Sequence, residues 1–129
     1  MKKGFVLKKE IEEVLGNYGI SVRTIENVYD DSDNTPLGYK LTLEWWTGLG
    51  ENIIEDISIP LNYQVSNIAE EIDRLKNSFD VDDHVESLIQ YRGTHGVPNS
   101  ISALVEDAQK LEEMYEKLSD ELWLLAKNK

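Results

Sequence analysis

Apolar residues at the start of the chain recur with a spacing that predicts a helix followed by a strand. Over residues 5–18 they return every three or four positions, the period of one helix face. Gly19 follows where a helix-ending glycine is expected, and Ile20 is placed to contact Leu15. Residues 20–29 are rich in β-branched side chains and predict a strand, although they alternate poorly.

The next segment shows the clearest alternation in the chain. Every second residue in it is large and apolar, namely Tyr39, Leu41, Leu43 and Trp45. Turn-forming residues 30–36 and 47–51 flank this strand, and residues 53–59 form a return strand that a proline ends. Three consecutive strands with short links predict an antiparallel meander. We expect its apolar row to pack on helices, because Lys40 and Glu44 on the other row would be costly to bury unpaired.

Two adjacent tryptophans in this strand, Trp45 and Trp46, point to opposite faces of the sheet. One of them belongs to the core. The other is either covered by a helix or exposed as a contact residue, and on the second interpretation Trp46 is a candidate partner-binding residue.

Beyond the third strand the apolar spacing becomes helical. One amphipathic helix is marked by apolar residues three or four apart, namely Val65, Ile68, Ala69, Ile72 and Leu75. Asp80 is placed as the N-cap of a second, shorter helix, with two more acids in its first turn. After a loop over residues 91–98, either Asn99 or Ser100 caps the last helix.

The last helix, expected over residues 100–127, carries a heptad-like seam. Its apolar residues step alternately by four and three positions, namely Leu104, Ala108, Leu111, Tyr115, Leu118, Leu122 and Leu125. This helix would be about 42 Å long, whereas a compact domain of this size is roughly 36 Å across. It therefore spans the domain or extends beyond it, and residues 122–125 are apolar around most of its circumference.

Two arrangements of this helix are open. In the first, a second copy of the chain packs on it in a homodimer, because the surplus apolar residues would otherwise form an exposed patch. The contact residues would then be Leu118, Leu122, Trp123 and Leu125. In the second, the whole apolar stripe packs on the chain's own sheet.

These elements define an α+β fold with an N-terminal helix, a three-stranded antiparallel meander, two shorter helices and one long C-terminal amphipathic helix. The 129 residues fit a single domain, with the first helix and sheet in residues 1–63 and a helical part in residues 64–129. The absence of cysteine excludes disulfides, thiolate zinc sites and thiol nucleophiles. No apolar stretch has the length of a signal sequence or a membrane span, so we expect a cytoplasmic protein with no membrane partner.

Charge narrows the choice of partners. The net charge is −12, from 25 acidic and 13 basic residues. Direct binding to nucleic acid is unfavourable for such a surface, whereas basic proteins, nucleic-acid-binding ones included, are favourable partners. The candidate contacts are carboxylates of the last helix, namely Glu112, Glu113, Glu116 and Asp120. The alternative is that the acidic surface serves solubility alone.

Two short motifs are better explained by structure than by ligand binding. Gly48 and Gly50 match part of a dinucleotide-binding loop, but the third glycine is absent and a strand follows, which favours a hairpin turn. Asp31, Asp33 and Thr35 have the first spacings of a calcium loop, but a proline replaces its glycine, which favours a solvated turn. We therefore expect no cofactor and no metal.

The two histidines are the candidates for metal binding or catalysis. His84 follows Asp80 by one helical turn, so the pair could hold a metal weakly, although a capping acid beside a surface histidine is the favoured explanation. His95 lies in a glycine-flanked loop and could act as a general base, but the G-x-S-x-G nucleophile signature is missing. A serine, histidine and aspartate assembled only by folding would not be visible in the sequence. The alternative function is thus a small hydrolase or metal-dependent enzyme that uses His84 or His95 with nearby carboxylates.

The C-terminal part of the chain resembles a known group of proteins. Residues 77–86 (NSFDVDDHVE), 96–101 (GVPNSI) and 104–108 (LVEDA) carry the resemblance, which extends over residues 77–125. The group comprises small uncharacterised accessory proteins of phages and mobile elements of Gram-positive bacteria, and it assigns no catalytic role to any residue. The resemblance implies a setting in which small acidic proteins bind and inhibit host defence or DNA-processing proteins.

The leading hypothesis combines these observations. It is a non-enzymatic acidic protein-binding module, and its specific form is a phage or mobile-element inhibitor of a host defence or nucleic-acid-processing protein.

Overall fold

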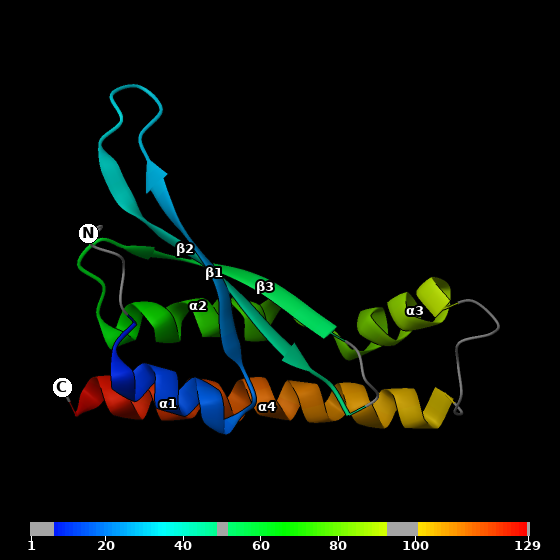
Figure 1. Cartoon of the computed structure of the whole chain (residues 1–129). Coiled ribbons are helices and arrows are strands. Elements are labelled where there is room, and N and C mark those ends of the chain that lie inside the picture. Colours follow the sequence, from blue (N-terminus) through cyan, green and yellow to red (C-terminus); the bar gives the residue numbers. More distant parts are fainter. Residues whose placement is uncertain (1–6, 49–51, 93–100, 129) are drawn as a thin grey trace.

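The helices α1, α2 and α4 lie on one side of a small sheet, and α4 runs along most of the molecule (Figure 1). The computed structural model describes residues 7–48, 52–92 and 101–128. In chain order the elements are α1 (Lys9–Asn17), β1 (Ser21–Tyr29), β2 (Pro36–Trp46), β3 (Asn52–Pro60), α2 (Val65–Ser78), α3 (Val81–Arg92) and α4 (Ile101–Lys127). The expected α+β fold, with its N-terminal helix, antiparallel meander and long C-terminal helix, is confirmed.

The end of α1 follows the glycine-terminated pattern that the sequence predicts. Gly19 has a φ of 73°, in the left-handed region that a residue with a side chain avoids. The Ile20 N–H donates to the Leu15 carbonyl and the Gly19 N–H to the Gly16 carbonyl, both at 3.0 Å. This pair of bonds satisfies carbonyls at the end of the helix and turns the chain into β1.

The sheet has the order β1-β2-β3 with both pairs antiparallel. Gly50, in the predicted turn between β2 and β3, lies outside the described residues. The predicted inner row of β2 is buried at Leu41, Leu43 and Trp45. Lys40 and Glu44 lie on the opposite face, where Lys40 Nζ is 3.3 Å from Glu26 and Glu44 is 3.9 Å from Arg23. The prediction of which row faces the helices is therefore confirmed.

The main core lies between the inner row of the sheet and the helices α1, α2 and α4. The seam residues of α4 that enter it are Leu111, Tyr115, Leu118 and Leu122. The Tyr115 ring meets Trp45 edge-on with 5.8 Å between centroids, an arrangement that the charge distribution of aromatic rings favours. A second, smaller cluster joins α3 to the start of α4 and comprises Val85, Leu88, Leu104 and Ala108.

The expectation that Leu118 and Leu122 contact a second copy of the chain is wrong. Both side chains are 0% exposed, because the sheet and α2 already cover the seam within one chain. Leu125 is half-buried and packs against the same core. Among residues 118–125, the apolar side chains that are exposed are Trp123 and Leu124, which lie outside the seam.

No helix in the described parts of the chain is both long and apolar enough to cross a membrane.

Candidate protein-binding surface

The predicted carboxylates Glu112, Glu113, Glu116 and Asp120 are all exposed on α4 and are called here the acidic stripe. They lie outside the buried seam because a helix with one apolar side leaves its remaining circumference to solvent. The stripe spans about 12 Å along the axis at 1.5 Å per residue. One cation moderates it, since Lys117 Nζ is 3.7 Å from Glu113, and this exposed pair contributes little stability.

The acidic stripe ends at an apolar groove, called here the Trp123 groove. Its volume is about 470 Å³, and it is lined by Ser66, Asp120, Trp123, Leu124, Ala126 and Lys127. Leu124 is 60% exposed and Trp123 is 37% exposed. Asp120 thus belongs to both features, and the folded chain joins a row of negative charge to an apolar hollow.

Trp123 is held in place by a carboxylate of α2. Its indole Nε1 donates to Asp73 Oδ2 at 2.8 Å, and the buried Ser119 hydroxyl donates to Asp73 Oδ1. Lys76 Nζ is 3.6 Å from the same carboxylate. Burial acts to raise the pKa of Asp73, but the hydrogen bonds from Ser119 and Trp123 and the charge of Lys76 outweigh burial and lower it. The ionised Asp73 therefore fixes one wall of the groove.

A second long-range bond fastens the other side of α4. The Tyr18 hydroxyl, just beyond α1, donates to Glu121 Oε2. This hydrogen bond, together with burial and the negative charge of Glu121, raises the pKa of Tyr18 to about 12. Neither Tyr18 nor Asp73 was a candidate from the sequence, because both act through partners far away in the chain.

Trp46 is separated from the acidic stripe. It is 64% exposed, which decides between the two interpretations of the tryptophan pair in favour of an uncovered Trp46. It borders a hollow of about 160 Å³ with Asp107, Lys110 and Met114, and the described lining contains none of the four stripe carboxylates. The structure therefore does not combine Trp46 and the stripe into one site.

The acidic turn between β1 and β2 uses its carboxylates within the turn. Asp30 Oδ1 accepts from the Ser32 N–H at 2.8 Å, and Asp33 Oδ1 accepts from the Thr35 N–H at 3.1 Å. Hydrogen bonds from the Ser32 hydroxyl and N–H lower the pKa of Asp30, and those from Thr35 lower the pKa of Asp33. These carboxylates shape the loop, as the solvated-turn interpretation expects.

The structure places His84 at the start of α3, beside its cap. Asp80 Oδ1 accepts from the Asp83 N–H at 3.0 Å, which is the predicted N-cap, and the His84 ring packs on Phe79 with 5.3 Å between centroids. A hollow of about 230 Å³ also brings Glu55 near His84, and burial raises the pKa of Glu55.

Two serines, Ser78 and Ser87, line the hollow beside His84. Ser78, which lines the same hollow, donates its hydroxyl to the backbone carbonyls of Arg74 and Leu75. Within residues 7–48, 52–92 and 101–128, no three His, Cys, Asp or Glu side chains are grouped as a metal site would require. His95 lies outside the described residues, so its predicted role as a base stays a prediction.

Comparisons of the chain with models of protein families, with curated proteins and with solved structures give no significant match.

Proposed function

We propose that this protein is a non-enzymatic binding module whose partner is a basic protein held on the outer side of α4. The observation that carries the proposal is the position of Leu124, which is 60% exposed in an apolar groove that Asp120 borders. An exposed apolar hollow rimmed by charge is typical of a protein-binding surface.

The groove supplies the apolar centre of the contact. Binding energy at protein interfaces concentrates in a few desolvated apolar or aromatic anchors, with tryptophan prominent among them. Trp123 is already oriented by its bond to Asp73, so a partner would lose little additional side-chain entropy on ordering this residue. A partner that inserts one apolar side chain beside Leu124 would fill the hollow.

The acidic stripe supplies the preference for a basic partner. Its carboxylates approach the groove from one side, and a net charge of −12 attracts basic surfaces over a distance of about one Debye length, roughly 8–10 Å. DNA presents one charge per about 1.7 Å of axis, much denser than four carboxylates over about 12 Å. Electrostatic attraction to a nucleic-acid-binding groove is therefore a better description than close imitation of DNA.

The resemblance of residues 77–125 to accessory proteins of phages and mobile elements supports a specific form of the proposal. In that form the protein acts in the cytoplasm and inhibits a host defence or nucleic-acid-processing protein by occupying its basic surface. Solubility alone is the competing explanation for the acidic surface, and it makes no use of the Trp123 groove.

The test uses two charge-matched variants. One converts the stripe to amides with Glu112→Gln, Glu113→Gln, Glu116→Gln and Asp120→Asn. The control removes the same number of charges from exposed positions on other helices with Glu12→Gln, Glu13→Gln, Glu70→Gln and Glu86→Gln. Both variants should fold, because surface changes of this kind cost little stability.

Affinity capture from a bacterial lysate, followed by mass spectrometry and direct binding of the purified partner, gives the result. We expect a basic protein that binds the native chain and the control variant, and that binds the stripe variant about tenfold more weakly at low salt. Equal binding by both variants, or a partner with an acidic contact surface, would reduce the stripe to a solubility device.

A further inference from the structure

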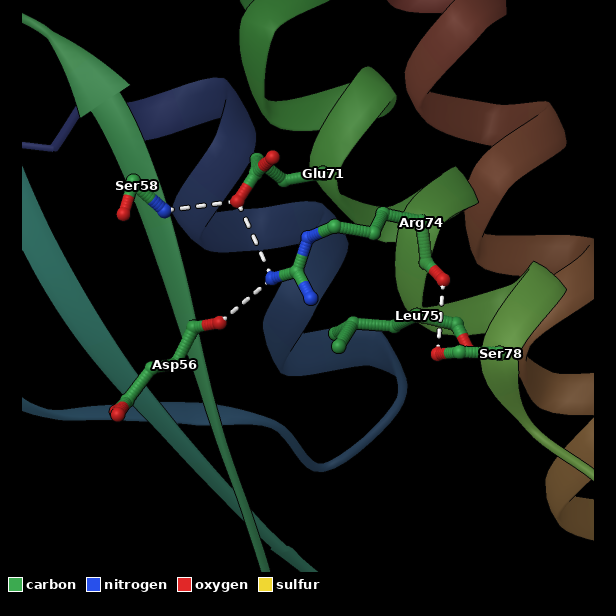
Figure 2. A network of polar contacts seen from close by, with 6 residues as sticks. All are labelled: Asp56, Ser58, Glu71, Arg74, Leu75 and Ser78. Carbon is green, nitrogen blue, oxygen red and sulfur yellow. Dashed lines mark hydrogen bonds and ion pairs between the residues drawn. The ribbon is translucent and has the colours of Figure 1, made fainter.

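The two edge strands of the sheet differ in their contacts with the helices. The edge at β3 is closed by two side chains of α2: Glu71 Oε1 accepts from the Ser58 N–H, and Arg74 Nη2 donates to the Asp56 carbonyl, both at 2.8 Å (Figure 2). Glu71 and Arg74 are also ion-paired with each other at 3.3 Å. Two backbone groups of this edge, the Ser58 N–H and the Asp56 carbonyl, are thus already engaged, and a further strand could not pair with them without displacing the α2 side chains.

The same bonds show which backbone groups point outward at β1. The Ser58 N–H points away from β2, so Ser58 and its partner Lys40 are not hydrogen-bonded to each other. The backbone N–H and carbonyl of Lys40 therefore point toward β1, where Glu26 lies opposite. Outward and inward residues alternate along an antiparallel strand. The N–H and carbonyl groups of Ile25 and Asn27, on either side of Glu26, therefore point out of the sheet.

Nothing in the described chain covers this edge. β1 is the terminal strand of the sheet, and no backbone hydrogen bond joins Ile25 or Asn27 to a loop or helix of the described part. The irregularities of β1 lie outside this segment, between Val22 and Thr24 and between Val28 and Tyr29. The central part of β1 is left regular.

β1 has few of the features that normally prevent an edge strand from pairing with another strand. Proline is absent from the strand, and so is lysine. Its two charged side chains both turn toward β2, with Glu26 3.3 Å from Lys40 and Arg23 3.9 Å from Glu44. An approaching strand would therefore meet no unpaired charge on β1 itself.

The hairpin of β1 and β2 extends beyond the helices at its far end (Figure 1). Ile25 lies within β1 opposite the fully buried Leu41, so it belongs to the inner face, yet in this edge strand it is 42% exposed. Leu37, on the same face, is 52% exposed. Apolar side chains of a strand added beside β1 would find apolar neighbours on this face, and polar ones would lie on the opposite face.

We propose that the free edge of β1 accepts an extended segment of a protein partner, with alternating apolar and basic residues, as an additional antiparallel strand. Charge selects this occupant over a second copy of the chain. Asp30, Asp31 and Asp33 cluster at the end of the hairpin, and every copy carries a net charge of −12. Self-pairing would bring two such charges together, whereas basic side chains complement them. The inference does not depend on the acidic stripe or the Trp123 groove.

The experiment measures amide hydrogen exchange by NMR on the full chain, with a nine-residue peptide of alternating valine and lysine as the probe. In the free protein the Glu26 amide is protected by β2, whereas the Ile25 and Asn27 amides exchange rapidly. The peptide should slow exchange at Ile25 and Asn27 and leave Glu26 little changed. Protection at alternate residues is the signature of strand addition, which nonspecific electrostatic binding would not produce.

Two variants make the test specific. Asn27→Pro removes an outward N–H and should weaken peptide binding about five- to tenfold, the effect of one hydrogen bond. A peptide N-methylated at alternate residues, on the side facing β1, should lose binding by a similar factor, and it requires no change in the protein. Binding of the N-methylated peptide tests the proposal even if Asn27→Pro fails to fold.

Three results would overturn the proposal. In the first, the peptide leaves exchange at Ile25 and Asn27 unchanged. In the second, the N-methylated peptide binds as well as the unmodified one. In the third, both amides are protected in the free protein and lose protection on dilution, which would identify a second copy as the occupant.

Discussion

The indole nitrogen of Trp123 donates a 2.8 Å hydrogen bond to Asp73, which fastens the exposed end of α4 to α2. Ser119, one helical turn earlier on α4, donates to the other oxygen of the same carboxylate. One charged residue of α2 thus satisfies a buried hydroxyl and orients a half-exposed aromatic ring. The stability of the fold and the shape of the Trp123 groove depend on the same contact.

Removing this carboxylate should destabilise the protein. Asp73→Ala leaves the buried Ser119 hydroxyl without its partner, and an unsatisfied buried polar group costs about 1–3 kcal/mol. Glu70→Ala, at an exposed position of α2, is the control and should change the free energy of unfolding by less than about 0.5 kcal/mol. Urea denaturation measures both values, and equal midpoints for the two variants would contradict the assigned role of Asp73.

The same contact predicts an acid dependence of stability. The folded state lowers the pKa of Asp73, so its contribution is present above the unfolded value of about 3.9. The contribution is lost as the pH falls through the lower folded pKa, because folded and unfolded states then bind the same proton. Unfolding free energies measured from pH 7 to pH 2 should converge for the native chain and Asp73→Ala, and a constant difference would contradict this linkage.

The bond between Tyr18 and Glu121 predicts an alkaline dependence instead. The folded state raises the pKa of Tyr18 to about 12, so its stabilising effect is complete below the unfolded pKa of about 10. It is lost as the pH rises from about 10 through 12, because the unfolded chain releases the phenolic proton first. Tyr18→Phe should cost about 0.5–1.5 kcal/mol at neutral pH.

Ultraviolet titration near 295 nm tests this prediction through the tyrosinate signal. Tyr18→Phe should remove a component that titrates near pH 12, while Tyr29→Phe, at an exposed position of β1, should leave that component in place. Loss of a component near pH 10 in Tyr18→Phe would show that the bond to Glu121 is not formed in solution.

Two glycines of the first helical region should respond in opposite directions to alanine. Gly19→Ala places a side chain at a φ of 73° and should destabilise the protein by about 1–2 kcal/mol. Gly16→Ala lies inside α1, where an added Cβ meets no atom within 4 Å, and should stabilise the protein by about 0.5–1 kcal/mol. Thermal unfolding measures both shifts, and a shift of the same sign in both variants would contradict the observed end of α1.

A substitution in the buried seam of α4 should lower stability, whereas a substitution in the Trp123 groove should leave stability nearly unchanged. Leu122→Ala should cost about 2–5 kcal/mol, because the side chain is completely buried, whereas Leu124→Ala should cost less than about 0.5 kcal/mol. Urea denaturation checks these values. Sedimentation at micromolar concentration checks the association state. A dimer that Leu124→Glu dissociates would show that a second copy fills the Trp123 groove and would contradict the proposed basic partner.

The local structure followed from the spacing of residues along the chain. A period of two marked β2 and a period near 3.6 marked the helices, because a side chain's direction depends on its own backbone. The apolar row of β2 followed from the cost of burying Lys40 and Glu44 unpaired. Gly19 marked the end of α1, since glycine is the residue that adopts a positive φ without strain. Exposure of the acidic stripe likewise followed from its place outside the seam.

What each surface contacts depended on how the helices and the sheet pack together. The seam of α4 fits a homodimer or an internal core equally well as a pattern, and the burial of Leu118 and Leu122 comes from the sheet and α2. The partners of Tyr18 and Asp73, and the closure of the β3 edge by Glu71 and Arg74, join elements distant in the chain. The spacing of apolar residues indicates whether a segment is a helix or a strand. These contacts depend instead on how separate elements lie relative to one another, and local spacing does not specify that.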